Sequence, residues 1–215
     1  GGEVVSYDCA QAHHPPLYYA IAGGIDALTG RQPGLLVAIA RGLSILAGLA
    51  ALLLMRAAMH RVFSERPFVV AAGLAIAVAS TSFTYVMGSF NNEPLAVLAA
   101  CAAIYLAARA LQAERPSPWL VGIGAVLGVG LLVKLTAVAV AVPLAVAAVG
   151  VGRRAGRGIA IRGTLVALAL ATVISGPWFV RNVMVMGTPT FNCAQRPLFG
   201  SMAQVVFQPE ASLLA

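Results

Sequence analysis

The longest apolar run of the chain, from position 116 to position 152, is interrupted by one charged residue, Lys134. The run holds about 37 residues, which would measure roughly 55 Å as a single helix. A bilayer core is about 30 Å thick and takes about 20 residues to cross. One straight span is therefore too long. The run predicts two short helices that meet at Lys134, at the tip of a helical hairpin and at a membrane surface.

The composition places the chain among membrane proteins. It is 60% hydrophobic and 10% charged, with a mean hydropathy of +0.89, whereas a soluble domain carries about 25% charged residues. Open sheets leave backbone groups unsatisfied in lipid, so we expect an all-α, polytopic helical bundle forming a single transmembrane domain over residues 1–215. The net charge of +7 does not indicate nucleic acid, because the basic residues lie between apolar spans and form no continuous face.

Hydropathy predicts about six spans and one interfacial helix. We expect an outer loop over 1–16, an interfacial helix over 14–30, spans within 35–180 and an outer segment over 181–215. The predicted spans are 35–55, 68–87, 94–111, 118–133, 135–151 and 163–180. The chain starts GGEVVSYD, in a loop predicted to lie outside, without an initiator Met. We therefore expect an interior piece of a larger protein, with a further span upstream.

The loops alternate in charge. One side carries nine basic residues against two acids, and the other carries five against five. The nine are Arg56, Arg61, Arg66, Arg109, Arg115, Arg153, Arg154, Arg157 and Arg162, and the two acids are Glu65 and Glu114. Because excess arginine marks the cytoplasmic side, Lys134 is predicted to face the exterior. We expect an integral membrane protein.

Polar residues gather at the outer ends of the spans in four short segments, 8–19, 89–94, 134–136 and 177–182. Ionisable groups at membrane depth are costly and usually functional. If helix packing brings the four segments together, they form a site at the outer edge of the membrane.

The first segment reads HHPPLYY, and its candidate substrate-binding residues are His13, His14 and Tyr18. Prolines suit a first helical turn, so the histidine pair also fits a solvated loop or a helix cap. A metal site is the less favoured alternative, because adjacent histidines need further ligands to hold an ion. Tyrosine rings suit interfacial depth.

The other segments also have structural explanations. Asn91, Asn92 and Glu93 suit a helix N-terminus, and Lys134 suits a side chain that reaches the interface. The functional interpretation makes the two asparagines substrate-binding residues. It makes Lys134 and Arg181 cations that bind a lipid-linked phosphate.

Five motifs in order carry a family resemblance: HHPPLYYAIAG, ARGLSILAGLAALLL, GSFNNEPLAVLAACAAIYLAARAL, GVGLLVKLTAVAVAVPL and GPWFVRNVMVMGTP. Over residues 13–190, the chain resembles the GT-C class of membrane glycosyltransferases. It is most similar to the protein-mannosyltransferase and lipid-A aminoarabinose transferase group and its bacterial relatives.

The resemblance implies a polyprenyl-phosphate-linked sugar donor, transfer on the exoplasmic face of a bacterial plasma membrane, and a glycan, lipid or protein acceptor. It implies a catalytic Asp or Glu in the first exoplasmic loop, just after the first span. Because that span is expected upstream of this sequence, two alternatives stay open: the acid lies upstream as well, or it is one of the two acids present in the loop, Glu3 and Asp8. It also implies that the lysine of the GLLVKLT segment, Lys134, lies near the donor phosphate.

Independently of the resemblance, transfer of a sugar from a phosphate requires a carboxylate that takes the acceptor's proton and cations that stabilise the departing phosphate. Asp8 and Glu93 are the candidate catalytic carboxylates, and Lys134 and Arg181 are the candidate cations. Nothing in this reaction requires a metal or a cofactor.

Two other classes of function stay open. A transporter or flippase would use the same polar cluster as a substrate pathway, and a non-catalytic membrane scaffold would lack the catalytic acid. Cys9 and Cys193 both fall in predicted outer loops, where a disulfide between them is permitted. Cys101 lies inside a span and fits a small packing residue.

Overall fold

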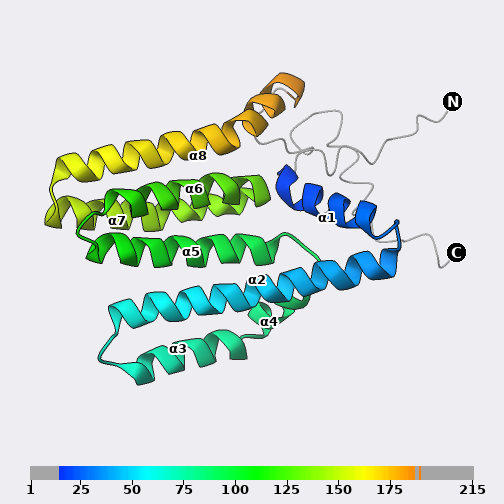
Figure 1. The fold of residues 1–215 in the computed structure, drawn as a ribbon, viewed down its shortest axis with the longest axis horizontal. Helices are drawn as coiled ribbons and strands as arrows, with labels where there is room; N and C mark the ends of the chain where they lie inside the picture. The colour runs from blue at the N-terminus through cyan, green and yellow to red at the C-terminus, as the bar shows by residue number, and fades with distance from the viewer. Residues whose placement is uncertain (1–14, 187–188, 190–215) are drawn as a thin grey trace, which may run out of the picture. The chain divides into compact units, whose positions relative to one another are not determined.

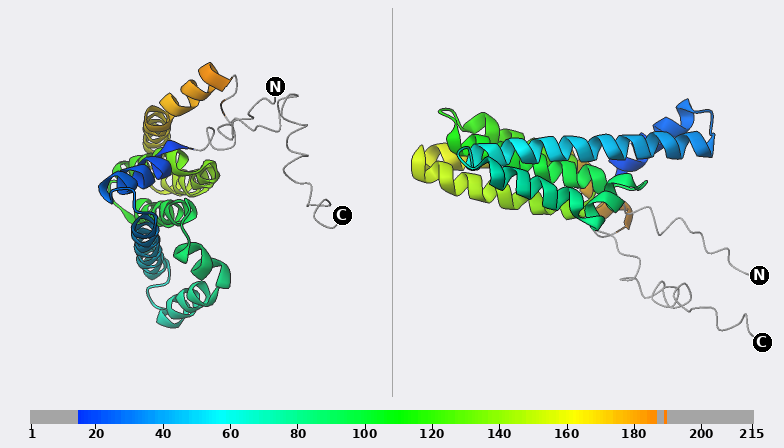
Figure 2. Two further views of the ribbon diagram at one scale, coloured as in Figure 1. Left: turned by 90° about the vertical axis from the view of Figure 1, so that its right-hand side faces the viewer. Right: turned by 90° about the horizontal axis from the view of Figure 1, so that it is seen from below.

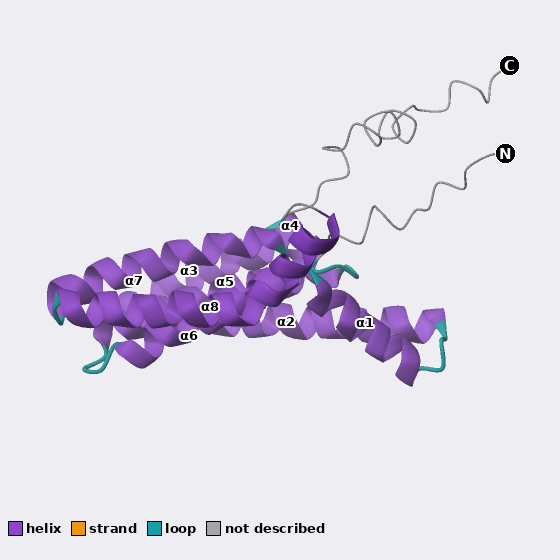
Figure 3. Ribbon diagram, turned by 90° about the horizontal axis from the view of Figure 1, so that it is seen from above, coloured by secondary structure: helices purple, strands orange, loops and turns teal. Residues whose placement is uncertain are grey.

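The computed structural model describes residues 15–186 and residue 189, and in this part of the chain it is built from helices without strands (Figures 1 and 3). The elements are α1 (Pro16–Leu28), α2 (Pro33–Val62), α3 (Pro67–Ala79), α4 (Thr81–Gly88), α5 (Glu93–Gln112), α6 (Ser117–Val133), the 3-10 helix η2 (Leu135–Val140), α7 (Ala141–Arg154) and α8 (Arg157–Met186). The predicted all-α membrane fold is confirmed. The chain divides into two parts, one from Pro15 to Gly176 and one that includes Pro177 onward, and each is described by itself.

Four helical segments of the described part are long and apolar enough to cross a membrane. They are α2, α5, η2 with α7, and α8. A fifth results if α3 and α4, which are bent by 63°, form one span. Helix α6 is also apolar but has 17 residues, because it ends just before Lys134. About six spans were predicted, and the structure supports four or five by length and composition.

Prolines and one serine set several helix boundaries. Proline occupies a first-turn position in each of α1, α2, α3, α5 and α6, where the missing N–H is not needed. Ser80 separates α3 from α4: its backbone is extended, and its hydroxyl accepts a hydrogen bond from the Phe83 N–H at 3.4 Å. The apolar run 68–87, predicted as one span, is therefore two helices.

The helices alternate in direction, so the basic loops meet at one end. Figure 1 shows the α2–α3, α5–α6 and α7–α8 connections at the same end of the bundle. Arg61 donates to the Gln112 side chain at 3.1 Å, and Gln112 donates back to the Arg61 carbonyl at 2.7 Å. Arg154 donates to the Ala113 carbonyl. We call this end, which carries Arg61, Arg109, Arg115, Arg153, Arg154 and Arg157, the arginine end.

Small residues allow the helices to approach closely. Helix α2 packs along α5, and α5 packs on α6 and α7 (Figure 2). Leu120 and Ile123 of α6 are fully buried in the core. A Cβ atom at Gly128 would lie 3.0 Å from the Ala171 Cα, and one at Gly124 would collide with the Ala167 backbone. Helices α6 and α8 therefore meet backbone to backbone, as small residues permit in membrane proteins.

Candidate functional site

Lys134 forms the turn of a helical hairpin. Helix α6 ends at Val133, and Lys134 has extended backbone angles, φ −159° and ψ 140°. Its N–H donates to the Gly130 carbonyl at 2.8 Å, and its carbonyl accepts from the Ala137 N–H at 3.0 Å. Helix α7 then runs back, so that Arg154 reaches the loop before α6. Lys134 therefore lies at the opposite end of the hairpin from the arginine end, where the length of the apolar run placed the turn.

The Lys134 ammonium pairs with the Glu93 carboxylate at the N-terminus of α5. The two side chains are 28% and 38% exposed, so a solvent-borne or interfacial ligand can reach both. The structure thus brings together one candidate catalytic carboxylate and one candidate phosphate-binding cation.

The loop between α4 and α5 is fixed by its own side chains. The side-chain oxygen of Asn91 accepts a hydrogen bond from the Glu93 backbone N–H at 2.9 Å, and its side-chain NH₂ group donates to the Ser89 hydroxyl at 2.7 Å. The side-chain NH₂ group of Asn92 donates to the backbone carbonyl of Val133, the last residue of α6, at 3.4 Å. The two asparagines therefore hold the start of α5 against the hairpin, which sets the position of Glu93 beside Lys134.

Tyr18 of α1 lies beside the same loop. Its ring centroid is 5.9 Å from that of Phe90 and 5.5 Å from that of Tyr19. The Tyr18 hydroxyl is enclosed and has no hydrogen-bond partner within the described residues. Burial, and secondarily the neighbouring Tyr19, raise the pKa of Tyr18 to about 12. The phenol therefore stays protonated over the physiological range.

An apolar hollow of about 400 Å³ lies behind this loop, between α1, α2 and α5. Tyr18, Phe90 and Asn91 line it together with aliphatic side chains such as Leu43 and Leu95. Three of the four predicted polar segments therefore meet around one loop and one hollow.

The fourth segment belongs to the second part of the chain and is described alone. The Arg181 guanidinium lies over the Trp178 ring at 4.7 Å and donates to the Asn182 side chain at 3.2 Å. Asn182 in turn donates to the Pro189 carbonyl at 3.3 Å. Arg181 is thus held by an aromatic ring and an amide.

Several predicted residues lie outside the described residues. They are Asp8, His13, His14, Cys9 and Cys193. Cys101 is a free, half-buried cysteine within α5. Within residues 15–186 and 189, no three His, Cys, Asp or Glu side chains gather as metal ligands would.

Sequence reasoning missed the contributions of Phe90 and Val133. Phe90 joins α1 to the α4–α5 loop through its ring, and Val133 contributes only its backbone carbonyl. An aromatic residue inside the polar segment 89–94 is a signal for the first. No sequence signal exists for a carbonyl freed by the end of a helix.

Residues 13–179 match the family of dolichyl-phosphate-mannose-protein mannosyltransferases. The chain belongs to this family. No curated protein sequence and no solved structure matches it. Membership of the dolichyl-phosphate-mannose-protein mannosyltransferase family makes the protein a membrane glycosyltransferase of the GT-C type. The matched region includes the hairpin, the Glu93–Lys134 pair and the hollow behind them.

Proposed function

We propose that this protein transfers a sugar from a polyprenyl-phosphate donor to an acceptor on the exoplasmic face of a bacterial plasma membrane. The ion pair of Glu93 and Lys134, partly exposed at the end of the bundle opposite the arginine end, supports this proposal most directly. The excess of arginine at the far end supports the exoplasmic assignment. The acceptor is a glycan, a lipid or a protein.

Lys134 is proposed to bind the donor phosphate. Lys134 is an extended residue between α6 and η2, and its partly exposed ammonium pairs with Glu93 at the start of α5. Without a donor, Glu93 neutralises the ammonium and keeps it ordered. When the donor phosphate replaces Glu93 as the partner of the ammonium, the positive charge stabilises the negative charge that develops on the phosphate as the sugar–phosphate bond breaks. Arg181, ordered by Trp178 and Asn182, is proposed as a second phosphate-binding cation.

Glu93 and Asp8 are the proposed catalytic carboxylates. A carboxylate beside an ammonium is stabilised as the anion, which is the form that accepts a proton from the acceptor. When the donor phosphate takes over Lys134, the Glu93 carboxylate becomes free to do so. Asp8 is proposed because it lies, with Glu3, in the predicted first outer loop, where the family resemblance implies a catalytic acid.

The apolar hollow behind the α4–α5 loop is proposed to hold the first part of the polyprenyl tail. Its walls are aliphatic, and its rim carries Tyr18 and Asn91. Asn92, His13 and His14 are proposed to contact substrate nearby. This arrangement would place an apolar tail and an anionic head on the two sides of one short loop.

The test is transfer of a radiolabelled sugar by the full-length protein in membrane vesicles. A polyprenyl-phosphate sugar and the corresponding nucleotide sugar are compared as donors. We expect transfer from the lipid-linked donor, and a loss of about tenfold or more in Lys134→Ala, because one charged contact to the departing phosphate is removed. Arg115→Gln, an exposed charge change at the arginine end, serves as the control. Transfer from the nucleotide sugar alone would contradict the proposal.

A further inference from the structure

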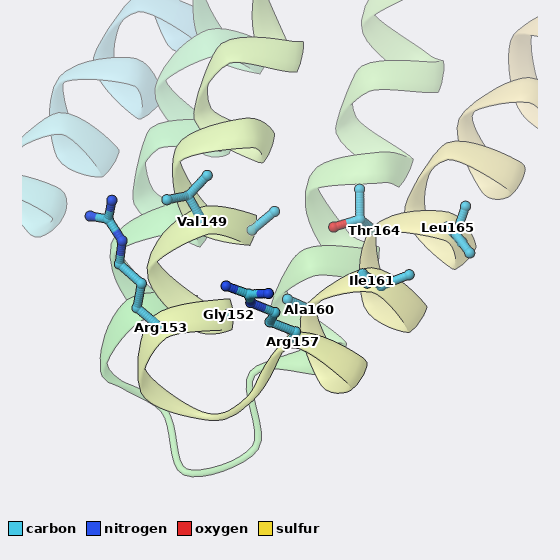
Figure 4. Close-up of a pocket in the computed structure, with 9 residues that line it drawn as sticks. Val149, Gly152, Arg153, Arg157, Ala160, Ile161, Thr164 and Leu165 are labelled. Carbon is cyan, nitrogen blue, oxygen red and sulfur yellow. The ribbon is translucent and has the colours of Figure 1, made fainter.

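A second hollow, of about 760 Å³, lies between α7 and α8 at the arginine end (Figure 4). Small residues, Gly152 and Ala160, form its floor, and Val149, Ile161 and Leu165 form its walls. These three wall side chains are 55%, 60% and 62% exposed. In a membrane helix bundle such surfaces face lipid, so the hollow is an apolar groove open to the bilayer.

Two arginines stand at the mouth of this groove. Figure 4 shows Arg157 reaching from the start of α8 toward α7, beside Gly152, and Arg153 extending along α7 on the side farther from α8. Within the described part of the chain, neither forms a hydrogen bond or an ion pair. Their neighbour Arg154, in contrast, donates to the Ala113 carbonyl. The groove therefore carries two guanidinium groups that the described residues leave without hydrogen-bond partners.

We infer that this groove binds one anionic phospholipid of the membrane, with the lipid head group bound by Arg157 and Arg153. Guanidinium groups bind phosphate through paired N–H donors. The acyl chain would run along the apolar walls beside Ile161 and Leu165, which continue away from the two charges. Basic pockets between membrane helices at the cytoplasmic side suit such lipid head groups.

A membrane lipid accounts for the groove better than a soluble anion does. A free phosphate would use the two arginines but leave the apolar walls without a partner. The excess of arginine at this end also predicts the cytoplasmic leaflet, whose surface is anionic. This lipid site lies at the other end of the α6–α7 hairpin from Lys134, so it does not depend on the proposed transfer reaction.

The experiment is native mass spectrometry of the purified full-length protein, titrated separately with phosphatidylglycerol, phosphatidylcholine and inorganic phosphate. The test variant is Arg153→Gln with Arg157→Gln, and the control, Arg66→Gln with Arg115→Gln, removes the same charge at the same end. We expect one tightly held phosphatidylglycerol, bound about tenfold more weakly by the test variant because two charge-assisted contacts are lost. The control variant should bind it as the wild type does.

A second variant keeps all charges and fills the groove. A Cβ atom at Gly152 meets only the Ala160 Cβ, at 3.5 Å, so the side chain of Gly152→Leu projects into the hollow. This variant should also lose the tight lipid, and an unchanged melting temperature would show that it is folded. Equal loss in both double variants, retention in Arg153→Gln with Arg157→Gln, or equally tight binding of phosphatidylcholine or inorganic phosphate would each overturn the inference.

Discussion

Lys134 at the α6–η2 turn pairs with Glu93, which starts α5 and lies 41 positions earlier in the chain. The partnership depends on two further contacts, because Asn91 bonds the Glu93 backbone and Asn92 bonds the Val133 carbonyl. A charge from the hairpin and a charge from the α4–α5 loop are thereby fixed at one end of the bundle.

The pair should contribute little to folding. Both side chains are partly exposed, and exposed ion pairs are worth about 0–1 kcal/mol. Lys134→Ala and Glu93→Gln should therefore each change the free energy of unfolding by less than about 1 kcal/mol. The measurement is chemical or thermal unfolding of the purified protein in detergent, with Arg115→Gln as an exposed control. A loss of several kcal/mol would mean that the pair is a structural element.

The close approach of α6 and α8 should make Gly124 intolerant of any side chain. A Cβ atom there would collide with the Ala167 backbone, so Gly124→Ala should destabilise the protein by about 2 kcal/mol through overpacking. Gly122, on the same helix, is the matched control, since a Cβ atom there meets only the Leu106 side chain at 3.4 Å. Gly122→Ala should be neutral or slightly stabilising. Equal effects of the two variants in a thermal unfolding assay would refute the packing argument.

Tyr18 should make stability sensitive to alkaline pH. Its pKa is raised from about 10 to about 12, so the folded state favours the protonated phenol. This contribution is fully present below pH 10 and is lost as the pH rises through about 12. Tyr18→Phe should therefore show a shallower fall in melting temperature across that window than the wild type. Ultraviolet titration of the phenolate measures the pKa of Tyr18 independently. Titration of Tyr18 near pH 10, as for an ordinary tyrosine, would contradict the prediction that its hydroxyl is enclosed.

The two ends of the bundle should lie on opposite sides of the membrane. In a background without native cysteines, a cysteine at position 92 should react with an impermeant maleimide added from outside, and so should one at position 13. A cysteine at position 61 should react only after the membrane is opened, because it lies at the arginine end. Labelling of position 61 from outside would show that the arginine end faces the exterior and would contradict the predicted topology.

Hydropathy and span length were enough to predict the hairpin at Lys134. A run too long for one span and interrupted by one charge leaves few alternatives, and the structure ends α6 at Val133. The same reasoning ended the predicted first span at Met55, before Arg56, although α2 continues to Val62. Arginine side chains extend to the interface while their backbone stays helical, so a charge does not mark the end of a helix.

Hydropathy could not predict the break between α3 and α4 at Ser80 or the pairing of Glu93 with Lys134. Hydroxyl groups lower the hydropathy of a segment only slightly, so the residues around Ser80 were predicted to lie in one continuous span. A serine hydroxyl is nevertheless enough to cap a new helix. Hydropathy also reports the depth of a residue and not its lateral neighbours. Glu93 and Lys134 could therefore be placed at one end of the bundle, whereas their pairing required the packing of α5 on α6.

The most direct test of the central claim is sugar transfer from the polyprenyl-phosphate donor by the charge-reversed variant, Glu93→Lys with Lys134→Glu. The reversal restores an ion pair between the same positions, so it should preserve the melting temperature. It removes the cation from the hairpin tip and the base from α5, so transfer should fall at least as far as in Lys134→Ala, by about tenfold or more. Wild-type transfer by the reversed pair would show that the two residues act only through their mutual attraction, and would contradict the account.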